Sequence, residues 1–192
     1  MLMMPRSLKC QVGFSMIEVM VTLAILAVGL LGLAGLQASS HIAQKEALSK
    51  AQALILAQDM ADRIASNRVD AKLGSSSTYN SATTYGTGNA DSTCSTSPGN
   101  SAQVAAKDLC EWDLALKGAT QTIGGTKAAL VPQARGCVSL QTTPIMQFVV
   151  TVAWAGNASL GSVPADRTCG SDAIPAMRRV VSVTVPLANL TN

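Results

Sequence analysis

A single carboxylate interrupts the most apolar stretch of this sequence. Glu18 is the one charged residue between Phe14 and Leu36. As a helix, that stretch would extend about 34 Å, and the hydrocarbon core of a bilayer is about 30 Å thick. A carboxylate in a membrane-spanning helix costs on the order of 2.5–3.5 kcal/mol, so it normally has a partner and a function. The alternative is a glutamate that headgroups and water tolerate near the interface.

Cysteines form the second group of residues that can do chemistry. Cys10 precedes the apolar stretch, and the other four cysteines follow it. An even number in an oxidising compartment predicts two disulfides, and four cysteines allow three pairings. We favour Cys94–Cys110, which are neighbours in sequence, and Cys137–Cys169, which would tie a strand to a later loop.

The sequence offers no constellation for catalysis. His41 is the only histidine, and a catalytic triad or a zinc site needs further partners. Glu111 and Asp113 flank Trp112, but nothing near them in sequence supplies a nucleophile, so we interpret them as a solvated helix face. We therefore expect a protein that is not an enzyme and that holds no cofactor and no metal.

The charge balance argues against a nucleic-acid partner. The chain has 14 basic and 11 acidic residues, a formal net charge of +3. Without Arg6 and Lys9, 12 basic residues remain against the same 11 acidic ones, a net charge of about +1. Nothing in this balance forms a basic patch, and the few aromatic residues give no stacking platform.

The apolar stretch also predicts where the rest of the chain lies. Arg6 and Lys9 precede it without any acid, and positive residues keep a leader on the cytoplasmic side. We expect the amino terminus inside and everything after Leu36 outside the cytoplasm. A buried helix of a soluble domain is rarely apolar all round for this length. A secretory signal would need small residues before its cut, but Leu36-Gln37-Ala38 begins with leucine.

One helix of about 50 residues is predicted to begin in the apolar stretch. There is no Pro or Gly between Gln37 and Arg68, and apolar residues recur there at three- and four-residue steps. The helix thus divides into a membrane half, 14–36, and an amphipathic half, 37–70, that packs on a head, 71–192. The stripe expected to face the head consists of Leu48, Ala51, Leu54, Ile55, Ala57, Ala61 and Ile64.

The head is predicted to combine a loop, a helix and an antiparallel sheet. Residues 73–101 are mostly Ser, Thr, Gly and Asn, which is typical of a surface loop held by Tyr79 and Tyr85. A helix over 102–117 would be capped by Asn100 or Ser101. Alternating apolar residues then predict a sheet of three or four strands, with segments at 135–140, 145–154 and 177–187.

Gly29, Gly32 and Gly35 punctuate the membrane half of the predicted helix. Small residues let neighbouring helices approach closely. Glycines also weaken a helix, so local melting of this helix within an assembly is a second interpretation. Ordinary glycines of a membrane helix are a third.

The start of the apolar stretch, together with the residue before it, resembles a motif of a known protein family. Gly13-Phe14-Ser15-Met16-Ile17-Glu18-Val19 resembles the class III leader junction of type IV prepilins and pseudopilins. The resemblance implies the α+β type IV pilin-like fold, with a long N-terminal helix on a small antiparallel sheet. It implies that a membrane prepilin peptidase cuts between Gly13 and Phe14, removes residues 1–13 and methylates Phe14. It also implies that Glu18 pairs with the N-terminal amine of a neighbouring subunit.

Scattered pieces of the head resemble minor pilins of the PilV type. They are Asp108-Leu109-Cys110-Glu111-Trp112, Arg135-Gly136-Cys137, Val150-Thr151-Val152-Ala153-Trp154 and Arg178-Arg179-Val180. This likeness implies a pilus subunit that primes assembly with other minor pilins and the major pilin, and that supports a tip adhesin, adhesion or twitching motility. Two alternatives remain: a minor pseudopilin of a type II secretion system, and a membrane-tethered adhesion or DNA-uptake module that never polymerises.

Overall fold

The computed structural model describes residues 13–90, 93–118, 122–123, 126–127, 131–156, 163, 167–174 and 177–187. The predicted leader, with Arg6, Lys9 and Cys10, lies outside the described residues apart from Gly13. The chain divides into two compact units, Met1–Ala43 and Gln44–Asn192.

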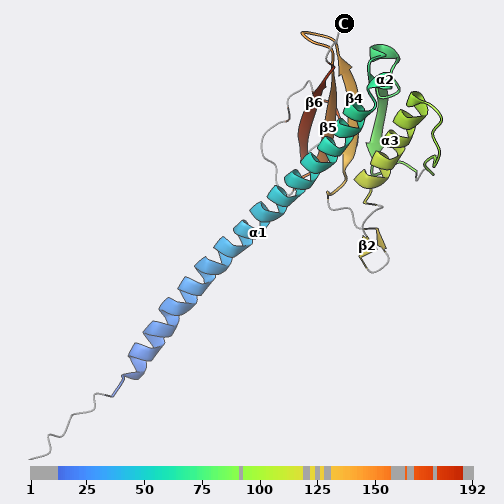
Figure 1. Cartoon of the computed structure of the whole chain (residues 1–192). Coiled ribbons are helices and arrows are strands. Elements are labelled where there is room, and N and C mark those ends of the chain that lie inside the picture. The colour runs from blue at the N-terminus through green and yellow to red at the C-terminus, as the bar shows by residue number, and fades with distance from the viewer. Residues whose placement is uncertain are drawn as a thin grey trace, which may run out of the picture. The chain divides into compact units, whose positions relative to one another are not determined.

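Helix α1 runs from Met16 to Ser66 without interruption, which confirms the single long helix (Figure 1). It is the one described helix that is long and apolar enough to cross a membrane. In the first unit none of its residues is buried. In the second unit it buries one face, formed by Ala53, Ala57, Met60, Ala61 and Ile64.

The second unit contains a four-stranded antiparallel sheet, as expected. Its order is β1-β4-β5-β6, so β1 and β6 are the edge strands (Figure 1). A separate two-stranded hairpin pairs β2 with β3. The strand bounds are β1 Ser81–Gly86, β2 Thr122–Ile123, β3 Thr126–Lys127, β4 Arg135–Gln141, β5 Gln147–Ala155 and β6 Arg178–Pro186.

One face of this sheet forms the core with α1 and α3. Strand β5 alternates as predicted, and the side chains of its inner face are fully or almost fully buried; they are Phe148, Val150, Val152 and Trp154. The buried alanines of α1 belong to the same core cluster as these strand side chains. The fold is therefore α+β, with the second part of α1 packed on an antiparallel sheet.

Helix α3, Ser101–Leu116, is capped as the sequence predicts. The Asn100 side chain accepts a hydrogen bond from the backbone N–H of Gln103 at 2.9 Å. In return, Gln103 Oε1 accepts from the N–H of Gly99 at 2.6 Å. Trp112 on this helix is fully buried and donates its Nε1–H to the Leu56 carbonyl of α1 at 2.8 Å. The cap and the indole thus position α3 against α1.

The predicted surface loop over 73–101 is partly wrong. After the short helix α2, Arg68–Ala71, the chain forms a 3₁₀ turn at Gly74–Ser76 and then edge strand β1. Tyr79 is fully buried in the core. The Ser- and Thr-rich composition of this segment did not predict a strand. Strand β1 is stabilised by pairing with β4 and by a few aromatic contacts, and not by apolar residues of its own.

The predicted apolar stripe on α1 is also only half correct. Ala57, Ala61 and Ile64 are buried, whereas Leu48 is 57% exposed and Ile55 is 63% exposed. Three- and four-residue steps fit two neighbouring faces of a helix, and the sequence alone does not say which face meets the sheet.

Candidate functional site: the processing and assembly segment

The predicted cleavage junction lies just before α1. Gly13 and Phe14 are outside the helix, and Phe14 is 84% exposed. A Cβ atom added to Gly13 would meet nothing within 4 Å. Among the described residues, packing therefore gives no reason for glycine at this position, and both residues of the predicted junction are exposed.

Glu18 lies in the first turn of α1. The Ser15 carbonyl accepts hydrogen bonds from the N–H groups of Glu18 at 3.0 Å and Val19 at 3.4 Å, which starts the helix. A carboxylate in the first turn interacts favourably with the helix dipole. The Glu18 side chain itself is exposed, and within the described part of the chain it forms no ion pair.

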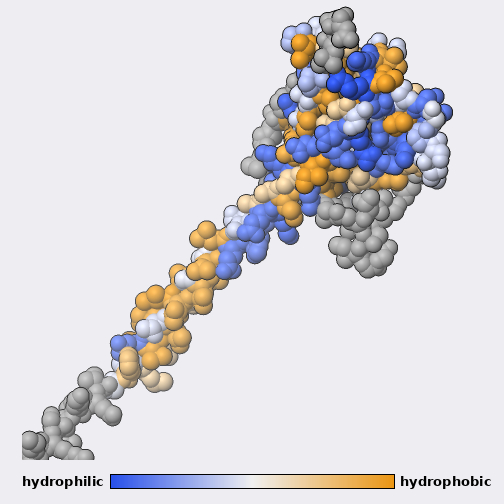
Figure 2. All heavy atoms as spheres, in the orientation of Figure 1, coloured by the Kyte–Doolittle hydropathy of each residue, from blue (hydrophilic) through white to orange (hydrophobic). Residues whose placement is uncertain are grey.

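An apolar surface surrounds this segment on all sides. Hydrophobic residues gather along the first part of α1 in Figure 2, and the large ones there are all exposed. Gly29, Gly32 and Gly35 lie in continuous helix, with open space where a Cβ would be. Such a surface needs lipid or other helices to cover it. Whether the glycines serve close packing or local melting stays a prediction.

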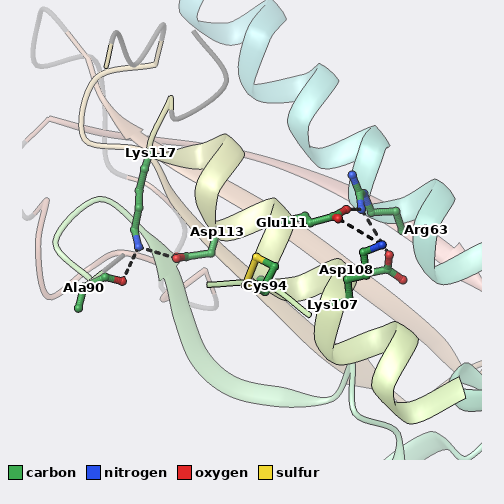
Figure 3. Close-up of a disulfide and its surroundings, with 9 residues drawn as sticks. Arg63, Ala90, Cys94, Lys107, Asp108, Glu111, Asp113 and Lys117 are labelled. Atoms are coloured by element: carbon green, nitrogen blue, oxygen red, sulfur yellow. Dashed lines mark hydrogen bonds and ion pairs between the residues drawn. A yellow bond between two sulfur atoms is a disulfide. The ribbon is translucent and has the colours of Figure 1, made fainter. Parts of the chain in front are cut away.

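Two disulfides cross-link segments of the head. Cys94–Cys110 ties the segment before α3 to that helix, with the Cα atoms 5.6 Å apart (Figure 3). Cys137–Cys169 ties β4 to the loop before β6, with the Cα atoms 5.9 Å apart. Both bonds join the pairs that the sequence analysis favoured.

A charged cluster joins α1 to α3 (Figure 3). Arg63 contacts Glu111 at 2.7 Å, Asp59 at 3.1 Å and Asp108 at 3.3 Å. The hydrogen bond from Arg63 is the main reason that the pKa of Glu111 is lowered. Burial alone would lower the pKa of Arg63, but the hydrogen bond to Glu111 and the charge of Asp59 raise it. Of these acids only Asp59 lies within helical reach of Arg63 in the sequence, four residues before it, and the other two are distant along the chain.

The same cluster continues to a buried tyrosine. The Tyr79 hydroxyl donates to Asp108 and accepts from the Asn67 side chain at 3.2 Å. Burial, and then the hydrogen bond to Asp108, raise the pKa of Tyr79 above its ordinary value. Tyr79 therefore stays a neutral donor at physiological pH, and the network stabilises the head.

The prediction of a solvated face for Glu111 and Asp113 is wrong for Asp113. Asp113 is only 5% exposed. It accepts hydrogen bonds from the Gly86 N–H at 2.6 Å and from Lys117 Nζ at 2.5 Å. A buried carboxylate needs such partners, and the end of strand β1, far away in the sequence, supplies one of them. Among the described residues, no group of three His, Cys, Asp or Glu is arranged to hold a metal.

Comparison with known protein families gives two matches. Residues 8–34, which include the junction and Glu18, match the prokaryotic N-terminal methylation motif. Residues 35–114, which run through α1 to α3, match the family of type IV pilin Tt1218. Neither the curated proteins nor the solved structures gave a match.

The two matched segments adjoin each other and agree with the architecture. One covers the segment where processing and methylation occur in such proteins, and the other continues into the part of α1 that packs on the head. The long helix and the antiparallel sheet have the type IV pilin arrangement. This chain therefore belongs to the type IV pilins.

Proposed function

We propose that this pilin, whose family acts in a pilus or a pseudopilus, is a minor pilin of a type IV pilus. It resembles the PilV type, and it primes assembly or forms part of the tip complex with other minor pilins, the major pilin and a tip adhesin. In that role it supports adhesion or twitching motility. The observation that carries the proposal is Glu18, a lone carboxylate in a helix segment without any buried residue.

Processing is the first step of the proposed function. Prepilin peptidase cuts the accessible junction between Gly13 and Phe14 and methylates the new amine. Before assembly, residues 14–36 anchor the chain in the inner membrane with the amino terminus cytoplasmic. Residues 37–70 and the head, 71–192, lie in the periplasm, where the disulfides of Cys94, Cys110, Cys137 and Cys169 form.

Assembly then exchanges lipid for neighbouring helices around the apolar segment. The carboxylate of Glu18 meets the Phe14 amine of an adjacent subunit. A buried carboxylate beside a buried ammonium is compensated, whereas either charge alone is costly. The pair therefore sets the axial position of each incoming subunit.

The mature amino terminus tests the processing step. Mass spectrometry of the protein isolated from cells should find a chain that begins at Phe14 and carries one extra methyl group. A chain that keeps Met1, or one that begins near Ser39, would contradict the proposal.

The variant Glu18→Gln tests the assembly step, because it removes the charge and keeps the shape. We expect its amount in sheared pili to fall at least about tenfold, as the loss of a charge-assisted interaction implies. Its level in the membrane should stay unchanged. Thr22→Ala is the control one turn further along, where the hydroxyl only bonds to the Val19 carbonyl at 2.9 Å. Equal incorporation of the two variants would contradict the role of Glu18.

The same strains distinguish the alternatives. A deletion strain that loses enzyme secretion and keeps twitching would identify a minor pseudopilin of a type II secretion system. A Glu18→Gln strain with full adhesion or DNA uptake would identify a tethered module that never polymerises.

A further inference from the structure

We propose that the outer face of the head's sheet is a binding site for an acidic carbohydrate. This face is opposite the core, and a cleft of about 450 Å³ lies on it. The cleft falls within the size range of ligand pockets, which is about 300–1,000 Å³. Strands β1, β4, β5 and β6 all contribute to its lining. The inference is independent of filament assembly, because it concerns the head of a single chain.

Small hydroxyl side chains form the floor of the cleft. The register places Thr151 between Cys137 and Ser182, and it pairs Val149 with Thr184. Strands lie about 4.8 Å apart, so these hydroxyls are regularly spaced across the sheet. Each hydroxyl can donate and accept a hydrogen bond, as sugar hydroxyls also do. The floor therefore matches a saccharide better than an apolar ligand.

The loop before β6 brings an arginine to this floor. Arg167 lines the cleft and donates from Nη1 to the Ser182 hydroxyl at 3.2 Å. The Ser182 hydroxyl lies 3.0 Å from that of Thr151. The Cys137–Cys169 disulfide holds the loop on the strand below. The guanidinium is thus directed at the hydroxyl row while the residue itself stays exposed.

Positive charge on this face is not neutralised by the described residues around it. Arg178 Nη1 donates to the carbonyls of Arg167 at 2.5 Å and Cys169 at 2.8 Å. Arg135 Nη1 donates to the Asn89 side chain at 3.5 Å. Within the part of the chain that the structure describes, neither these two arginines nor Arg167 forms an ion pair. A guanidinium without an acidic partner favours a carboxylate or sulfate on the ligand, which it can bind through two hydrogen bonds.

None of the described residues that line the cleft is aromatic. Stacking on bases is the usual source of affinity for single-stranded nucleic acid, so this class of partner is disfavoured. The combination of hydroxyls and arginine favours a short saccharide that carries acidic groups, such as a uronic-acid oligomer.

Calorimetry on the full-length protein in detergent can test this site. The probe is trigalacturonic acid, and its uncharged methyl ester is the matched ligand control. We expect the acid to bind and the ester to bind at least about tenfold more weakly, as expected for the loss of a charged hydrogen-bond acceptor. Triglutamate, an acidic peptide, should bind more weakly than the saccharide.

Variants connect the binding to the cleft. Arg167→Gln should weaken trigalacturonate binding roughly tenfold, and Ser182→Ala should weaken it less, because a neutral hydrogen bond contributes less than a charged one. Lys50→Gln is the control, since it removes the same charge from an exposed position on α1. The proposal is overturned if the acid does not bind, if the ester or triglutamate binds as tightly as the acid, or if Arg167→Gln behaves like Lys50→Gln.

Discussion

The two parts of α1 have the same secondary structure and opposite surroundings. Up to Ala43 the helix has no buried residue, whereas its second part buries a face of alanines together with Met60 and Ile64. The second part finds its partners in its own chain. The first part, apolar all round, must find them in lipid or in other molecules.

Charged residues show the same difference. In the second unit Arg63 and Asp113 have partners from other elements of the head. In the first unit Glu18 forms no ion pair with any residue that the structure describes. Helical structure is therefore a poor guide to function here, and the presence or absence of partners is a better one.

The difference between the two parts of α1 predicts its largest effect on stability for a substitution of Trp112, which packs against the second part. We expect Trp112→Ala to lower the free energy of unfolding of the head by about 3–5 kcal/mol. The indole is fully buried, donates a hydrogen bond to the Leu56 carbonyl of α1, and lies so close to Gly136 that a Cβ added there would clash with its ring. Urea unfolding of the full chain in mild detergent, followed by near-UV circular dichroism, measures the change.

Leu33→Ala is the control for Trp112→Ala in the first part of α1, where the side chain is exposed. It should leave unfolding of the head unchanged. If Leu33→Ala destabilised the head by a similar amount, the difference between the two parts of the helix would disappear.

Identical substitutions on the two faces of the second part give a smaller effect. Ala57→Leu inserts a larger side chain where the residue is fully buried against the core, and we expect a loss of about 1–3 kcal/mol. Ala51→Leu makes the same change at an exposed position of the same helix and should change stability by less than about 0.5 kcal/mol. Urea midpoints of the two variants provide the measurement. Equal losses would mean that the buried face is assigned wrongly.

Local patterns predicted much of this fold. The long helix, the Asn100 cap and the alternation around Phe148 depend on neighbours in the sequence, and the structure confirms them. The short junction motif indicated the family, because glycine, phenylalanine and glutamate occur at fixed spacing before an apolar helix.

Long-range pairing could not be predicted in the same way. Strand β1 forms by pairing with β4. The face of α1 that belongs to the core is the one with Met60 and its alanine neighbours. Likewise, the buried carboxylate of Asp113 accepts a hydrogen bond from the N–H of Gly86. Each of these features depends on a partner more than 25 residues away, and single-sequence periodicity does not encode such partners.

A smaller effect is expected at the start of α3. Asn100→Ala removes the acceptor for the Gln103 N–H and should lower the free energy of unfolding by about 1 kcal/mol. Asn100→Asp keeps a side-chain acceptor and should retain most of the stability. Urea unfolding of both variants provides the measurement. If both variants lost the same amount, the cap would not be the cause.

The smallest effect concerns the pH dependence of the contact between α1 and α3. Hydrogen bonding to Arg63 lowers the pKa of Glu111 below its ordinary value of 4.5, so the folded head holds this proton less tightly than the unfolded chain. The stabilisation is complete above the unfolded pKa and is lost as the pH falls through the folded one.

Glu111→Gln should therefore be less stable than the wild-type protein at pH 7, and the difference should shrink below about pH 4.5. Unfolding midpoints measured from pH 7 down to pH 3 provide the test. The effect is modest because Glu111 is more than a third exposed and water screens the pair. A constant difference at every pH would show that Glu111 acts through packing, and the contact between α1 and α3 would then depend on shape rather than on charge.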